Sequence, residues 1–182
     1  MNTGSTENTA YLEFQKKVSG QNINPQTLLA TDYLNHFNEV HMLLEMLPDM
    51  PECLEDVQHW SPKSYQEHFR DSVFQAKDLA IEAYEHAPDE HRLPFEKIVQ
   101  RMDTLILQTV AQVSAAVAEK NGTELHKIIK NYSPKMQKLI DECSAIINGA
   151  RPVVHQEDID SYFSETSRAD GLKQDDIDDL FD

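Results

Sequence analysis

Residues 94–122 read PFEKIVQRMDTLILQTVAQVSAAVAEKNG, and apolar residues recur through this stretch every three or four positions. The repeat lasts for roughly six helical turns, which is typical of a bundle or coiled-coil seam. Its members are Phe95, Ile98, Val99, Met102, Leu105, Ile106, Val110, Val113 and Val117. Asn121-Gly122 predicts the end of this helix and a tight hairpin. A second helix is then expected over 123–148, with a kink or restart at Ser133-Pro134 and Gly149 as its C-cap.

Two further helices are predicted upstream of this hairpin. Asn24-Pro25 and Ser61-Pro62 each combine an N-cap residue with proline at the first helical position. They predict helices over 25–47 and 62–87, separated by a proline-rich break and a short turn that packs Trp60 against the bundle. No segment alternates at the period of a strand. We therefore expect an all-α protein whose residues 25–149 form an antiparallel four-helix bundle.

We expect different structures for the two ends of the chain. Residues 1–24 begin with small polar residues and are expected to be flexible, with a short helix ending at Gly20 as the alternative. That helix would carry Tyr11, Phe14 and Val18. Residues 150–182 hold ten acidic and three basic residues, so we expect a disordered acidic tail.

Composition limits the partners and the compartment. The net charge of −16 predicts that nucleic acid and anionic membranes are repelled, whereas a partner with a basic face is attracted. Cys53 and Cys143 fit no metal or redox spacing and are predicted to be buried thiols. The first twenty residues lack the features of a signal peptide, and no apolar run is long enough to span a bilayer. These features predict a cytoplasmic protein. With only five glycines the chain offers no Gly-rich phosphate or dinucleotide loop, so no cofactor is expected.

The end of the chain repeats a short acidic pattern. Gln174-Asp175-Asp176-Ile177-Asp178-Asp179-Leu180-Phe181-Asp182 places Ile177, Leu180 and Phe181 on one face of a helix and the aspartates on the other. The same spacing occurs in residues 156–163, at Ile159, Tyr162 and Phe163. Each copy is too short to be a stable helix alone, so we expect it to fold only against a partner. The alternative is a solubilising tail that binds nothing.

The peptide of residues 174–182 resembles the acidic peptides with which the CheZ phosphatase and FliM switch-protein families bind the response regulator CheY. Its position at the end of the chain is similar to that in CheZ. The resemblance implies that Ile177, Leu180 and Phe181 anchor the peptide on a receiver domain. It also implies that Gln174 belongs to the motif and that Asp175, Asp176, Asp178 and Asp179 supply steering charge.

The CheZ resemblance also implies a catalytic glutamine four residues after an acid on a bundle helix. A glutamine can position the water that attacks the phosphoryl-aspartate without adding negative charge there. Two pairs have this spacing, Asp71 with Gln75 and Glu96 with Gln100. The family's glycine before the glutamine is replaced by Phe74 in one and Val99 in the other. Phosphatase and simple adaptor both remain open.

Histidines suggest two other kinds of site. His36 with Glu39, and His68 with Asp71, could present two histidines and two carboxylates to one metal centre, although di-metal bundles have the acid before the histidine. This His/carboxylate metal-binding bundle is the alternative function, and polar surface with a buried histidine is the ordinary explanation. His126 loosely resembles the histidine of phosphotransfer domains, but Ile129 and Lys130 depart from that motif. A homodimer along the Phe95–Val117 seam is also expected, with a wholly intramolecular core as the alternative.

Overall fold

The computed structural model describes residues 3–150, and the side chains from residue 9 onward. All regular elements in this range are helical, which confirms the all-α class. The α-helices are α1 (Thr3–Lys17), α2 (Asn35–Met46), α3 (Leu54–His59), α4 (Tyr65–Asp71), α5 (Lys77–Tyr84), α6 (Asp89–Ala118) and α7 (Gly122–Ile147). Two short 3₁₀ helices are η1 (Thr31–Leu34) and η2 (Pro51–Cys53).

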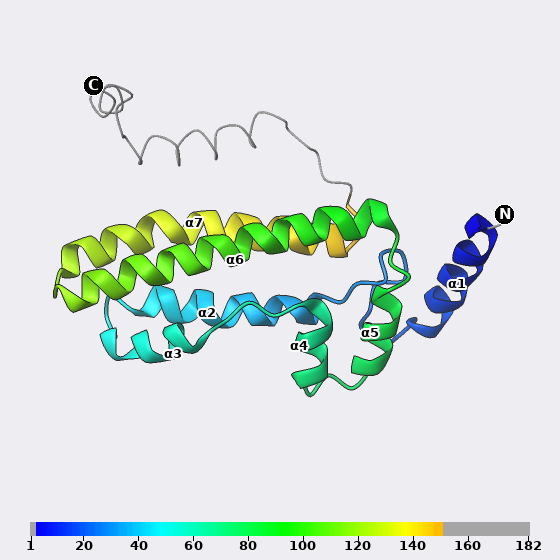
Figure 1. The fold of residues 1–182 in the computed structure, drawn as a ribbon, viewed down its shortest axis with the longest axis horizontal. Helices are drawn as coiled ribbons and strands as arrows, with labels where there is room; N and C mark the ends of the chain where they lie inside the picture. Colours follow the sequence, from blue (N-terminus) through cyan, green and yellow to red (C-terminus); the bar gives the residue numbers. More distant parts are fainter. Residues whose placement is uncertain (1–2, 151–182) are drawn as a thin grey trace, which may run out of the picture. The chain divides into compact units, whose positions relative to one another are not determined.

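Helices α6 and α7 form the predicted hairpin and lie side by side in Figure 1. α6 begins at Asp89, so Pro94 lies inside the helix and does not start it. The buried residues of the two helices keep the three-and-four spacing that the sequence predicts. They are His91, Phe95, Ile98, Met102, Ile106, Thr109, Val113 and Ala116 on α6, and Leu125, Ile129, Tyr132, Met136, Leu139, Ile140, Cys143, Ile146 and Ile147 on α7.

The hairpin turn is closed by backbone hydrogen bonds and a side-chain cap. Lys120 has a φ of 55°, and the Asn121 N–H donates to the Ala116 carbonyl at 2.9 Å. The Asn121 side chain then accepts a hydrogen bond from the Glu124 N–H at the start of α7. This geometry is the Schellman motif, in which a left-handed residue satisfies the last carbonyls of a helix.

Helix α7 continues without interruption through Pro134, so the predicted restart there is wrong. The Ser133 hydroxyl donates to the Glu45 carboxylate, which ties this part of α7 to α2. Gly149 has a φ of 91° and ends the helix as predicted. Its N–H and that of Ala150 donate to the Ile146 and Ala145 carbonyls at 3.0 and 2.9 Å.

The helix predicted from Pro25 does not begin there. The Asn24 side chain accepts hydrogen bonds from the Gln26 and Thr27 N–H groups, but Leu28 takes a φ of 58° and turns the chain away from a helical path. Leu28 and Leu29 are fully buried. Their burial in an irregular segment outweighs the local capping signal, and α2 begins only at Asn35.

The helix predicted over 62–87 is split into α4 and α5, which pack against each other. Ser64 and Glu67 form a capping box, so α4 starts after Ser64 and not after Ser61. The Ser72 hydroxyl donates to the Phe69 carbonyl and accepts from the Phe74 N–H. These local bonds compete with the helix ladder and end α4. Four long antiparallel helices are therefore not confirmed.

At the N-terminus the structure contains the helix α1, in the segment where a short helix was the alternative. The last turn of α1 and the residues after it are anchored, because Phe14, Val18 and Ile23 are buried in the core. The Phe14 ring stacks on His86 with centroids 4.6 Å apart, and the Tyr11 hydroxyl donates to the Gln26 carbonyl. The apolar residues therefore decide the structure of this segment, despite its small polar start.

Most of the expected dimer seam lies inside the single chain. Phe95, Ile98, Met102, Ile106 and Val113 are buried against other parts of the same molecule. The intramolecular core therefore uses these side chains, and a homodimer stays a prediction.

We expect Lys120→Gly to stabilise the protein. Lysine at a φ of 55° pays a steric cost that glycine avoids, so the free energy of unfolding should rise by about 0.5–1 kcal/mol. Urea unfolding followed by helical circular dichroism measures the change. Gly149→Ala is the comparison and should destabilise the protein. It adds a Cβ at a φ of 91°, and this Cβ would lie 2.5 Å from Gln26 Oε1. A stabilising Gly149→Ala, or a destabilising Lys120→Gly, would contradict this account of the two helix ends.

Candidate functional site

The predicted partner-binding residues lie outside the described part of the chain. These are Ile159, Tyr162 and Phe163 in the first motif, and Gln174, Asp175, Asp176, Ile177, Asp178, Leu180 and Phe181 in the second. Their role as receiver anchors stays a prediction.

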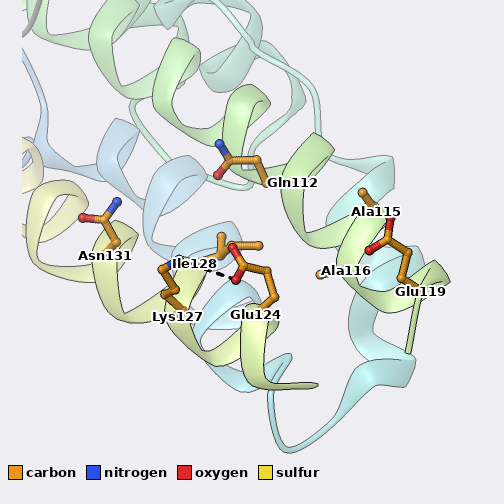
Figure 2. A pocket seen from close by; sticks show the side chains of 8 residues that line it. All are labelled: Gln112, Ala115, Ala116, Glu119, Glu124, Lys127, Ile128 and Asn131. Atoms are coloured by element: carbon orange, nitrogen blue, oxygen red, sulfur yellow. Dashed lines mark ion pairs between the residues drawn. The ribbon is translucent and has the colours of Figure 1, made fainter. Parts of the chain in front are cut away.

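A groove of about 430 Å³ lies between α6 and α7 near the hairpin turn (Figure 2). Ala115 and Ala116 on α6 are small enough to leave this space beside Ile128 on α7. Sequence reasoning missed the groove, although the run of small residues Ser114-Ala115-Ala116 was its signal.

Polar side chains surround the apolar floor of this groove. Gln112 and Asn131 supply amides, and Glu119 and Glu124 lie at the end near the turn. Lys127 Nζ lies 3.6 Å from Glu124 Oε2. The groove can therefore exchange hydrogen bonds with a polar ligand, but its amides, carboxylates and amine form no nucleophile–base pair of the kind used in covalent catalysis.

The Glu96–Gln100 pair lies on one face of α6, as predicted. Glu96 Oε1 accepts from the Tyr84 hydroxyl at 2.8 Å and from the Arg92 guanidinium at 3.1 Å. Burial and then the hydrogen bond to Glu96 raise the pKa of Tyr84, which keeps its hydroxyl protonated. Glu96 therefore joins α5 to α6, whereas Gln100 is exposed one turn later. The four-residue spacing of Glu96 and Gln100 on the helix is therefore as predicted, but the Glu96 carboxylate already accepts hydrogen bonds from Tyr84 and Arg92.

The Asp71–Gln75 pair does not share a helix face. Asp71 is the last residue of α4, and Gln75 lies exposed in the loop before α5. Lys63 Nζ lies 2.8 Å from Asp71 Oδ2, and this hydrogen bond and charge lower the pKa of the carboxyl group. The helical placement expected for this pair is wrong, because the chain breaks at Ser72.

The two histidines of the metal hypothesis do come together. His36 and His68 have ring centroids 6.2 Å apart, and His68 Nε2 lies 3.2 Å from Asp32 Oδ2. Glu39 is exposed, however, and Asp71 is paired with Lys63. Within residues 3–150 no group of three or more His, Cys, Asp or Glu side chains is arranged to hold a metal ion. Within the described residues, His36, Glu39, His68 and Asp71 are therefore not brought together as one metal centre.

His36 belongs to an aromatic cluster that fastens the linker after α3. Its ring stacks on Trp60 with centroids 4.9 Å apart, and the Trp60 indole N–H donates to the His36 carbonyl at 3.1 Å. The Tyr33 hydroxyl donates to the Lys63 carbonyl at 2.7 Å. Burial, followed by the charges of His68 and Lys63, lowers the pKa of His36 to about 4. The imidazole is therefore neutral near pH 7.

Three other candidate side chains have simple environments. His126 is exposed, with Nδ1 2.8 Å from the Gly122 carbonyl, and its phosphotransfer role stays a prediction. Cys53 and Cys143 are buried free thiols, as predicted. Burial raises the pKa of Cys143 to about 12, which removes thiolate character near neutral pH.

Comparison with known proteins adds no family assignment. No protein-family model, curated protein or solved structure matches this chain. None of the helices within residues 3–150 combines the length and apolar character needed to cross a membrane.

We predict that Trp60 fluorescence reports the protonation of His36. A protonated imidazole stacked on an indole quenches its emission, and the chain contains one tryptophan. Quenching should therefore develop as pH falls toward about 4 and not near 6.5. Because the pKa of His36 is lower in the folded chain, its contribution to stability is complete above pH 6.5 and is lost as pH falls toward 4.

The matched control is the exposed neighbour His59. His36→Gln should abolish the low-pH quenching, whereas His59→Gln should leave it unchanged. A quenching midpoint near 6.5, or the loss of quenching in His59→Gln, would contradict the lowered pKa of His36 and its role as the quencher.

Proposed function

We propose that this protein is a cytoplasmic component of bacterial chemotaxis or flagellar signalling that binds CheY or a CheY-like receiver through its C-terminal peptide. The observation that carries the proposal is the repeated motif, in which Ile177, Leu180 and Phe181 share the spacing of Ile159, Tyr162 and Phe163. An acidic tail that serves only solubility has no need of apolar residues at helical spacing in two places.

The expected strength of this contact suits signalling. Burying three apolar side chains contributes roughly 5–9 kcal/mol, and ordering the peptide costs roughly 2–5 kcal/mol. The difference supports a weak, reversible complex. The surrounding aspartates increase the association rate with a basic face more than they increase the affinity.

The helical domain is the second part of the proposal. Two forms are open, an adaptor that only tethers the receiver and a phosphatase that removes its phosphoryl group. For the phosphatase form, Glu96 and Gln100 are better candidates than Asp71 and Gln75, because only the first pair lies on one helix at the required spacing. The engagement of Glu96 with Tyr84 and Arg92 favours the adaptor form.

We expect Ile177→Ala combined with Phe181→Ala to weaken receiver binding by roughly 2 kcal/mol or more, which is the low end for truncating large buried side chains. Calorimetric titration of the full chain with a purified receiver measures the change. Thr166→Ala, between the motifs, is the control and should bind like wild type.

A chain ending at Ala150 provides a second comparison, because it keeps the hydrogen bonds that end α7. It should not bind the receiver. Binding of equal strength by this shortened chain would place the contact on the helical domain and overturn the proposed role of the peptide.

Phosphoryl-receiver decay separates the phosphatase from the adaptor. If Gln100 positions water, Gln100→Ala should slow decay by roughly 10²-fold or more while receiver affinity stays the same. Decay would be timed at saturating protein, with Gln75→Ala for the competing pair and the exposed Gln108→Ala as the matched control on α6. A wild-type chain that does not accelerate decay removes the phosphatase form. Acceleration that none of these changes affects would show that the glutamine assignment is wrong.

A further inference from the structure

Three methionines form a row along α2 and the turn that follows it. Met42 is 55% exposed, Met46 is partly buried against the core, and Met50 is 39% exposed. The three lie four residues apart, and the Met50 N–H donates to the Met46 carbonyl at 2.8 Å, but Met50 has a φ of −133° and lies in the turn between α2 and η2. The row therefore covers the last turn of α2 and the turn that follows it.

Acidic side chains accompany this methionine row. Glu39 and Asp49 are exposed beside it, Glu45 is exposed but already accepts a hydrogen bond from the Ser133 hydroxyl, and Glu52 follows in η2. The whole segment from residue 18 to residue 62 contains seven acids and neither lysine nor arginine. The surface is therefore apolar along its centre and negatively charged at its edges.

We propose that the methionine row is a docking surface for a basic amphipathic helix of another protein. Methionine is flexible and polarisable, so a row of methionines can adapt to the apolar face of a partner helix. The flanking carboxylates would attract the lysines or arginines on the sides of that helix. This inference does not depend on the receiver-binding peptide.

The charges and the exposed side chains favour this partner over other occupants. A second copy would offer the lysines of α7, namely Lys127, Lys130, Lys135 and Lys138, but α7 has no large exposed hydrophobic side chain among the described residues. Nucleic acid and anionic lipid would be repelled by the acidic edges. A basic amphipathic helix matches both the exposed methionines and the acidic side chains beside them.

The test uses the full chain with methyl-labelled methionines and a synthetic 18-residue helical peptide of leucine and lysine. The chain has six methionines, of which Met102 and Met136 are fully buried and serve as internal controls. The methyl signals of Met42, Met46 and Met50 should shift together as peptide is added, while those of Met1, Met102 and Met136 stay in place. A lysine-only peptide should leave the row unchanged, because charge alone does not bury the methionines.

Substitution of the row distinguishes docking from general attraction to an acidic protein. The double substitution Met42→Gln with Met50→Gln should lower the affinity for the leucine–lysine peptide by about ten-fold or more. Leu107→Gln is the matched control, because Leu107 is an exposed apolar residue on α6 and 48% of it is accessible. Equal affinity of the double variant and wild type, or methyl shifts confined to residues outside the row, would overturn the proposal.

Discussion

Apolar side chains of α6 and α7 pack against each other along the hairpin, and α2, α3 and η1 contact this pair. Met102, Ile106 and Met136 are fully buried there, and replacing any one with alanine would cost roughly 2–5 kcal/mol. α2 and η1 contact α7, and the Thr27 hydroxyl donates to the Ile147 carbonyl at 2.6 Å within the core. The α6–α7 contact therefore fixes where α2 exposes its methionines and where α6 presents Gln100.

The sequence predicts this hairpin well because its signals are local and regular. The heptad-like spacing, Asn121-Gly122 and Gly149 all act within one or two helical turns. Prediction fails where burial overrides a local cap, as at Asn24-Pro25, where Leu28 and Leu29 enter the core in an irregular conformation. It also fails at Ser61-Pro62, although Ser64-Tyr65-Gln66-Glu67 is a capping-box pattern that could have been recognised.

The candidate sites depend on contacts that spacing does not reveal. Gln75 leaves its expected helix because Ser72 forms competing hydrogen bonds, and Glu96 is occupied by Tyr84 from a different helix. His36 and His68 approach each other as expected, but Asp32 replaces the predicted acids beside them. The spacing of Met42, Met46 and Met50 was visible in the sequence, whereas their exposure required the packing of α2 on α7.

Two acidic surfaces thus have different proposed partners, a receiver for the C-terminal peptide and a basic helix for α2. The most direct measurement is an amide-resolved titration of the isotope-labelled full chain with an unlabelled CheY-like receiver. Signals of residues 174–182 should shift on binding, with or without those of residues 156–163, while the buried amides of α6 and α7 keep their positions. Receiver binding that leaves residues 174–182 unchanged would contradict the assignment of the peptide as the receiver-binding element.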